Sequence, residues 1–177
     1  MMCDLFPEVP YIRGERIVLK GLTQEDAPAL REFVGSPNVY RYLPTFLFEK
    51  KYDDVQCVIE RLYTECLEDS LILGVFVEEG FCGLAEFYGY RAEYKKISLG
   101  YRFAERCWGK GIGTETTALM LRYLREHTDI DIITASTMVE NIGSDKVLLK
   151  NGFSLVVHAA EEDWGFEKPA IVNKWLL

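Results

Sequence analysis

The sequence has few of the residues that build metal sites and disulfide frameworks. Only two histidines occur in 177 residues, and the five cysteines are scattered without a C-x-x-C pair. An odd number of scattered cysteines does not indicate a disulfide framework, and so few ligands do not indicate zinc. We therefore expect no metal, no disulfide, and a protein of the reducing cytoplasm.

Basic charge and long apolar runs are also scarce. Lys and Arg number 20 against 28 Asp and Glu, which gives a net charge of −8. Nucleic-acid binding needs a basic surface, and a membrane span needs about 20 apolar residues, so neither partner is expected. The N-terminal stretch MMCDLFPEVPYIRGER has no secretion signal. The negative field would attract a cationic amine, although acidity more often serves solubility.

The first half of the chain reads as a strand, two helices and an irregular segment. The run 16–22 has strand character, and 23–34 reads as a helix that Thr23 caps. The segment 36–48 contains two prolines and several aromatics, so it is not one regular element. The run 52–69 places apolar residues at helical spacing. With 49% hydrophobic residues and no repeat or linker, residues 1–177 are expected to form a single domain.

The second half alternates strands and helices. The β-rich runs predict an antiparallel meander, a helix follows Gly113, and Asn141 caps a second helix. Asn151-Gly152 reads as a left-handed helix stop; the competing hairpin turn is weaker because the residues before it do not alternate. The predicted strands are 71–77, 80–91, 95–104, 130–138, 154–159 and 170–177, and the predicted helices are 114–127 and 141–153.

Three glycines, in the stretch RCWGKGIGTET, join the end of a strand to the start of a helix. The first amides of a helix have no internal acceptor, and the helix dipole adds partial positive charge there. A glycine-rich entry lets several of these amides converge on a phosphate, and a lysine between the glycines favours that over a plain turn. The spacing does not match a P-loop. A dinucleotide fingerprint, with Glu140 as its acidic residue, stays a minor alternative because too little chain remains for a Rossmann domain.

Two motifs resemble the GNAT acetyltransferases, and within them the RimJ/RimL-like N-acetyltransferases. The segment Trp108-Gly-Lys-Gly-Ile-Gly113 is similar to the family's Gln/Arg-x-x-Gly-x-Gly/Ala motif, with Trp in place of Gln/Arg. A rival register, Arg106-x-x-Gly109-x-Gly111, also satisfies that pattern. The second motif, Asn141-x-x-Ser144 followed by Gly152-Phe153, resembles the family's Asn-x-x-Ser helix. The resemblance spans almost the whole chain.

The resemblance implies an α/β (α+β) fold with a mixed, mostly antiparallel central sheet of about seven strands flanked by four helices. It implies that the strand ending at Phe103 and the strand 130–138 splay apart, with acetyl-CoA between them as co-substrate and no metal. The residues implied to bind it are Phe103 and Asn141, main-chain groups near Glu105, and the loop residues Trp108, Gly109, Lys110, Gly111, Ile112, Gly113 and Thr114.

The same resemblance suggests candidates for the chemistry. A tyrosine donor common in the family is replaced here by Leu148, so Ser144 is the candidate that protonates the leaving thiolate; a helix-capping serine is the other interpretation. The family's usual base position is Ser98, which leaves Glu86 as the candidate base or, equally, a solvent-facing strand residue. Tyr101 lines the acceptor side or simply packs.

The implied activity is acetyl transfer from acetyl-CoA to a primary amine by direct attack on the thioester. The acceptor would be a protein N-terminal amine, as in ribosomal-protein acetylation, or a small-molecule amine, and the enzyme a monomer or homodimer. Residues 36–48 and the second helix would form the acceptor wall. A non-catalytic acyl-CoA-binding sensor remains the alternative from a different class.

Overall fold

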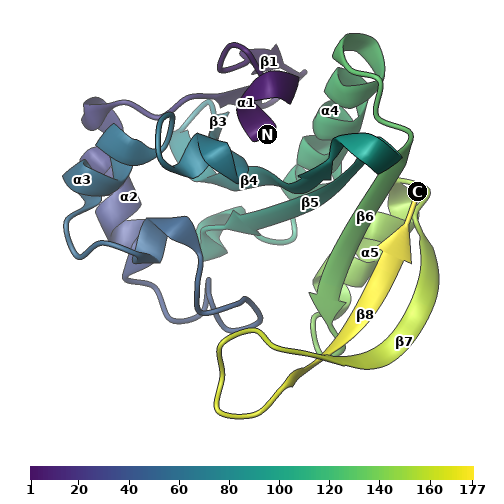
Figure 1. Cartoon of the computed structure of the whole chain (residues 1–177). Coiled ribbons are helices and arrows are strands. Elements are labelled where there is room, and N and C mark those ends of the chain that lie inside the picture. Colours follow the sequence, from purple (N-terminus) through teal and green to yellow (C-terminus); the bar gives the residue numbers. More distant parts are fainter.

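The structure is a computed structural model that describes all 177 residues, and its eight strands belong to one sheet (Figure 1). The strand order is β1-β2-β3-β4-β5-β6-β8-β7, and every neighbouring pair is antiparallel except β5 with β6. The sheet is therefore mixed and mostly antiparallel, as expected. The strands are β1 Ile12–Arg13, β2 Val18–Lys20, β3 Ser70–Val77, β4 Gly80–Arg91, β5 Lys96–Phe103, β6 Ile132–Met138, β7 Ser154–Glu162 and β8 Ala170–Leu176.

Five α-helices accompany the sheet, one more than expected. The additional helix is the short α1, and the additional strand is β1, both near the N-terminus. Tertiary packing explains α1: Phe6, directly after it, is 1% exposed and its ring lies 5.1 Å from that of Phe87. The helices are α1 Met2–Leu5, α2 Ala27–Val34, α3 Val55–Arg61, α4 Ile112–His127 and α5 Ile142–Lys150.

The helix ends follow the local sequence closely. Thr23 forms a capping box with Asp26, although a short 3₁₀ turn precedes α2. Asn141 caps α5, because its Oδ1 accepts a hydrogen bond from the Ser144 amide at 3.3 Å. Gly152 stops α5 with a φ of +88°, the left-handed conformation that its position predicted. The expected cap Asn141 and stop Gly152 are confirmed, whereas Thr23 caps the 3₁₀ turn and Asp26 is the N-cap of α2 itself.

The helix predicted over 52–69 is shorter than expected. α3 ends at Arg61 and the chain continues through turns to β3. The Tyr63 hydroxyl accepts from the Leu22 amide and donates to the Ile72 carbonyl, so tertiary hydrogen bonds hold this stretch in turns. Local spacing alone did not contain that information.

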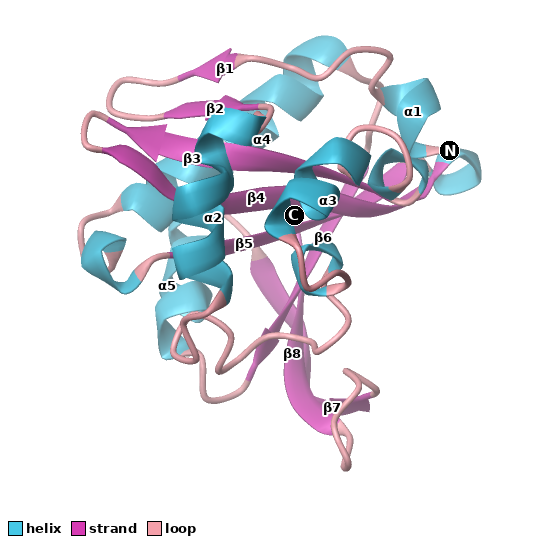
Figure 2. Ribbon diagram, turned by 90° about the vertical axis from the view of Figure 1, so that its left-hand side faces the viewer, coloured by secondary structure: helices cyan, strands magenta, loops and turns pink.

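Two hydrophobic clusters cover the two faces of the sheet. One contains 24 buried residues and includes side chains of α1, α4 and α5, and the other contains 13 and includes side chains of α2 and α3. Figure 2 shows the same division, with α2 and α3 in front of the strands and α4 behind them. None of the helices has the length and apolar character needed to cross a membrane.

The sheet opens where β5 and β6 diverge. These parallel strands are paired only from Lys96–Ser98 with Ile132–Thr134. Beyond Ser98, β5 stays with β4, whereas β6 continues beside β8. The expected splay is present, and it places an opening in the middle of the sheet.

Candidate active site

Two cavities meet at the opening between β5 and β6. The larger has a volume of about 730 Å³ and the smaller about 470 Å³. Because both cavities share lining residues, they adjoin beside the glycine loop. The shared residues are Tyr42, Leu43, Tyr101, Arg102, Asn141 and Ser144.

The glycine loop forms one end of the smaller cavity. Gly109 and Gly111 have φ values of +70° and +76°, which glycine adopts without strain, and Gly111 is the N-cap of α4. The first backbone bond of the helix runs from the Glu115 amide to the Gly111 carbonyl, and the amides of residues 109–114 donate to no protein acceptor. Unpaired amides at a helix N-terminus are an arrangement that can hold a phosphate.

Gly113 permits close helix packing, whereas the other two glycines adopt left-handed backbone. It lies inside α4 with ordinary helical backbone. A Cβ atom there would lie 3.2 Å from Val147 Cγ2 and 3.3 Å from Phe103 Cε2. Gly113 therefore allows α4 to approach α5 and β5 closely, beside the loop.

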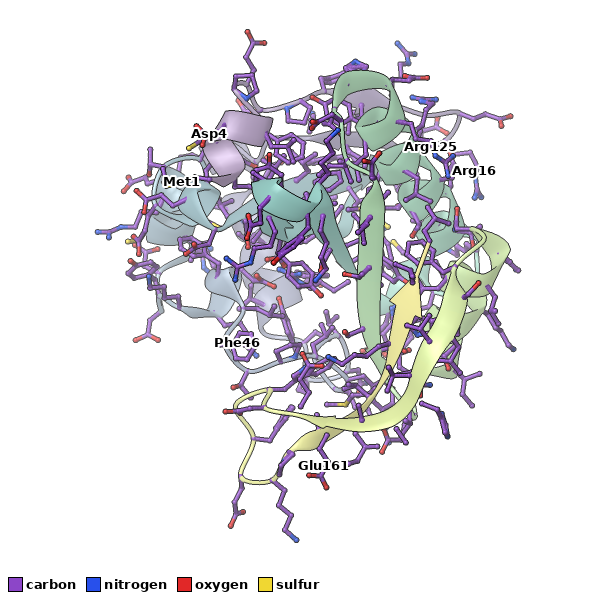
Figure 3. The ribbon with its side chains drawn as sticks, turned by 45° about the vertical axis from the view of Figure 1, so that its right-hand side comes forward. Met1, Asp4, Arg16, Phe46, Arg125 and Glu161 are labelled. Carbon is purple, nitrogen blue, oxygen red and sulfur yellow. The ribbon has the colours of Figure 1, made fainter.

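Arg16 supports the loop from outside, and the sequence motifs did not indicate it. Its Nε donates to Glu115 Oε2 at 2.7 Å and its Nη1 to the Lys110 carbonyl at 2.9 Å. Figure 3 places Arg16 beside α4. Partial burial opposes ionisation of Glu115, but the hydrogen bonds from Arg16 lower the pKa of that carboxyl overall. Arg16 thus ties the start of β2 to the loop and to the first turn of α4.

Phe103 presents its backbone to the opening. The Ala104 amide donates to the Cys82 carbonyl on β4. In an antiparallel ladder, hydrogen-bonded residues alternate with residues whose amides point outward. The amide of Phe103, the residue before Ala104, therefore points away from β4. No β6 residue pairs with it there. Trp108 Nε1 donates to the Phe103 carbonyl at 2.9 Å. The tryptophan that replaces Gln/Arg therefore fixes the end of β5.

The start of α5 brings three predicted residues together. Asn141 and Ser144 line both cavities, and the Tyr101 hydroxyl donates to the Ser144 carbonyl at 3.4 Å. The Ser144 amide is bound to Asn141, whereas its hydroxyl has no protein partner. Burial raises the pKa of Tyr101, so its hydroxyl keeps its proton. A free hydroxyl thus faces the junction of the two cavities.

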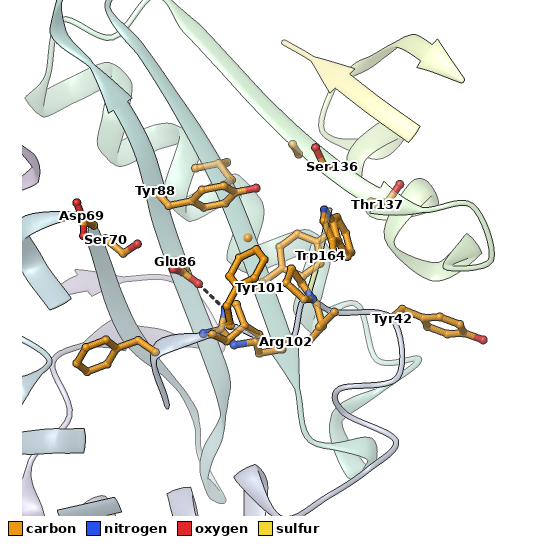
Figure 4. Close-up of a pocket in the computed structure, with 18 of the residues that line it drawn as sticks. Tyr42, Asp69, Ser70, Glu86, Tyr88, Tyr101, Arg102, Ser136, Thr137 and Trp164 are labelled. Carbon is orange, nitrogen blue, oxygen red and sulfur yellow. Dashed lines mark hydrogen bonds and ion pairs between the residues drawn. The ribbon is translucent and has the colours of Figure 1, made fainter. Parts of the chain in front are cut away.

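A buried ion network forms the floor of the larger cavity (Figure 4). Arg102 donates through Nε and Nη2 to Glu49 at 2.5 and 2.6 Å, and through Nη1 to Glu86 Oε2 at 2.7 Å. Burial alone lowers the pKa of Arg102, but the two carboxylates outweigh it and raise that pKa. The Tyr40 hydroxyl donates to Glu49 at 3.0 Å. Neither Glu49 nor Arg102 carried a signal in the sequence, because only the fold joins them.

The irregular segment 36–48 forms one wall of the larger cavity, together with the loop between β7 and β8. The Thr45 amide donates to the Trp164 carbonyl at 2.9 Å, which joins the two loops. Tyr88 lines the opposite side, and burial with the nearby Glu86 and Glu162 carboxylates raises its pKa. Aromatic rings and carboxylates therefore surround this cavity.

Two predicted site residues lie outside both cavities. Lys110 and Glu105 are exposed. The Glu105 side chain instead accepts a hydrogen bond from Asn38, and its carbonyl accepts one from the Trp108 amide. The remaining predicted residues, Glu86, Tyr101, Phe103, Trp108, Gly109, Gly111, Ile112, Gly113, Thr114, Asn141 and Ser144, line one cavity or both.

Comparison with known proteins gives one family. A family model described as an acetyltransferase (GNAT) domain matches residues 16–154. The uncharacterized N-acetyltransferase YnaD of Bacillus subtilis (strain 168) is 24% identical over 142 residues, which are 80% of this chain and 81% of YnaD. The solved structure of RimL, a ribosomal L7/L12 alpha-N-protein acetyltransferase, has a TM-score of 0.78 at 20% identity, covering 96% of this chain and 94% of RimL. The microcin C7 self-immunity acetyltransferase MccE, solved with acetyl-CoA and AMP, has a TM-score of 0.78 at 20% identity and covers 93% of each chain.

The chain belongs to the GNAT acetyltransferase family, because the family model covers most of its length. It is an acetyl-CoA-dependent N-acetyltransferase, in line with the relatives of that name. The likeness to RimL agrees with the RimJ/RimL-like group that the motifs indicated. The expected fold class is confirmed, with eight strands and five helices in place of about seven and four.

Proposed function

We propose that this enzyme transfers the acetyl group of acetyl-CoA to a primary amine that enters the larger cavity. The observation that carries the proposal is that the two cavities adjoin, with Tyr101, Asn141 and Ser144 lining both. The acetyl donor enters from the glycine loop and the acceptor from the opposite face. Direct attack then needs no covalent acyl-enzyme intermediate.

The smaller cavity supplies the donor site in this proposal. The free amides from Gly109 to Thr114 hold the pyrophosphate of acetyl-CoA, and Arg16 keeps the loop in place. The Phe103 amide, which points into the opening, stabilises the oxyanion that forms at the acetyl carbonyl. Asn141 positions the pantetheine arm.

The larger cavity supplies the acceptor site. The ammonium form of the amine loses one proton to Glu86, and the nitrogen lone pair forms the new C–N bond. As the tetrahedral intermediate collapses, its nitrogen loses a second proton to solvent and the C–S bond breaks, and the Ser144 hydroxyl donates a proton to the departing thiolate. Solvent then restores the proton of Ser144 and removes that of Glu86. Tyr101 packs at the junction and holds α5 through Ser144.

The acceptor in this proposal is either the N-terminal amine of a protein or a small amine. RimL is described as an alpha-N-protein acetyltransferase, and MccE was solved with AMP, so both kinds occur among similar folds. The five free cysteines support a reducing compartment such as the cytoplasm. A monomer or homodimer stays the expectation.

Release of free CoA thiol from acetyl-CoA tests the proposal. The purified chain is incubated with a panel of alkyl amines and of short peptides with free N-termini, and with the N-acetylated form of each as control. We expect at least one free amine to accelerate thiol release and to gain an acetyl group by mass spectrometry. Binding of CoA without release by any amine would instead support the non-catalytic sensor.

A further inference from the structure

The buried network of Glu49, Arg102 and Glu86 carries one more negative charge than positive. Glu49 is 1% exposed, Arg102 4% and Glu86 8%. Arg102 places all three of its bonded nitrogens on the two carboxylates, and neither carboxylate forms a salt bridge with any other residue. An unbalanced buried charge is unfavourable unless a counter-charge approaches it.

Of the two carboxylates in the network, only Glu86 lines the larger cavity. Glu86 lines the cavity, whereas Glu49 lies behind Arg102 and does not line it. The side chain of Glu86 is 10% exposed, against 1% and 2% for its partners. Figure 4 shows the Glu86 carboxylate between Arg102 and Tyr88 at the cavity wall. A counter-ion within the larger cavity can therefore approach the network at Glu86.

The rest of the cavity also suits a cation. Five carboxylates and two cationic side chains line it, and one of the cations, Lys51, is paired with Glu65. The other is Arg102. Aromatic rings, whose faces attract cations, complete the lining. They are Tyr42, Phe46, Phe48, Tyr88, Tyr101 and Trp164.

We propose that the Glu49–Arg102–Glu86 network makes the acceptor site selective for a cation, so that the acceptor is bound as its ammonium form against Glu86. Glu49 and Arg102 are positioning residues: Arg102 orients Glu86, and Glu49 neutralises Arg102 so that Glu86 keeps its negative charge for the ligand. The inference rests on the proposed acceptor role of this cavity. It makes the site favour amines that are protonated when they bind over uncharged ones.

The test compares two ligands of equal length that differ in charge. Butylammonium and 1-butanol are titrated by calorimetry into the protein saturated with CoA, where no transfer occurs. We expect the wild-type protein to bind butylammonium at least about tenfold more tightly than 1-butanol, since the ion gains attraction in a site of low dielectric constant. Equal binding of the two ligands would overturn the proposal.

Variants separate the charge of the network from its packing. Glu49→Gln keeps the shape of the side chain and removes the excess charge without touching the ligand, so the preference should fall below about threefold. Glu86→Gln should have the same effect. Glu60→Gln, on the exposed side of α3, removes the same charge outside the cavity and should leave the preference intact.

The dissociation constant for CoA serves as the internal check. Glu49→Gln and Glu86→Gln should both retain it, because the glycine loop lies in the other cavity. If Glu49→Gln does not fold, Glu86→Gln carries the comparison. A full cation preference in either folded variant would overturn the proposal, whereas cation preference without acetyl transfer would overturn only the proposed function.

Discussion

At the scale of single residues, the structure separates two interpretations of Ser144. Its amide is bound to Asn141, which is the N-cap of α5, so the serine hydroxyl is not the cap of this helix. That hydroxyl has no protein partner, and Ser144 lines both cavities. It is therefore available for the protonation of a leaving thiolate, the role proposed above.

The prediction for Ser144→Ala follows from that geometry. Turnover should fall by about 5- to 150-fold, the equivalent of about 1–3 kcal/mol for a lost donor to a charged group. The melting temperature should change little, because the Asn141 cap remains. Thiol release and thermal unfolding measured on the same preparation check both statements. Normal turnover per folded molecule would show that solvent protonates the thiolate.

At the scale of elements, the junction between β5 and α4 makes the donor site. Gly111 has a φ of +76° and its hypothetical Cβ lies 3.3 Å from Arg16 Nη2. A side chain here would therefore strain the backbone and also displace the arginine that holds the loop. The amides of the loop depend on both features for their common direction.

Gly111→Val should accordingly weaken CoA binding by at least about tenfold, because a β-branched side chain is poorly tolerated in left-handed backbone. Unfolding free energy should fall by only about 1–3 kcal/mol. Gly35→Ala is the matched control, since Gly35 has a φ of −78° and its nearest Cβ neighbour lies at 3.4 Å. Calorimetry with CoA and chemical denaturation provide the two measurements. An unchanged CoA affinity in folded Gly111→Val would remove the loop from the donor site.

A substitution of Gly113 should have a different effect from a substitution of Gly111. Its close approach to Val147 and Phe103 means that a larger side chain would push α4 away from α5 and β5. A substitution there disturbs packing together with ligand binding, so it is not a clean probe of the phosphate site. The sequence suggested equal roles for Gly111 and Gly113, and the structure distinguishes them.

At the scale of the whole molecule, charge is expected to influence which substrates arrive. The chain has a net charge of −8, and the larger cavity is rich in carboxylates. Such a field raises the local concentration of cations and is screened by salt. Acceptors that carry a positive charge should therefore be captured faster at low ionic strength.

The kcat/KM for a protonated alkyl amine should fall by about threefold or more as ionic strength rises from about 0.01 to 0.15 M, since the Debye length shrinks from about 30 to 8 Å. Methoxyamine, a nucleophile that is uncharged at neutral pH, is the control and should show little change. Steady-state rates at saturating acetyl-CoA give the dependence of kcat/KM on ionic strength for both amines. An equal salt response of the two amines would exclude electrostatic capture of the acceptor.

The sequence by itself determined most of the elements and the glycine loop of the proposed donor site. Hydrophobic spacing placed the meander and α4, and residues with strong local preferences marked the ends of α5, at Asn141 and Gly152. The glycine loop was predictable because it is a short, contiguous stretch whose backbone conformation depends on its own residues. Its three glycines, with the Asn141 and Ser144 motif, were enough to indicate the family.

Only the tertiary structure decided the composition of the larger cavity, the proposed acceptor site. Glu49, Glu86 and Arg102 come from a loop and two strands, and nothing in their local sequence indicates that they meet. The same holds for Arg16 and Glu115, which are 99 residues apart in the chain. Ion pairs between distant segments depend on how sheets and loops pack, and short-range propensities do not encode that packing. In the proposed function, the contacts that select the acceptor therefore exist only after the chain has folded.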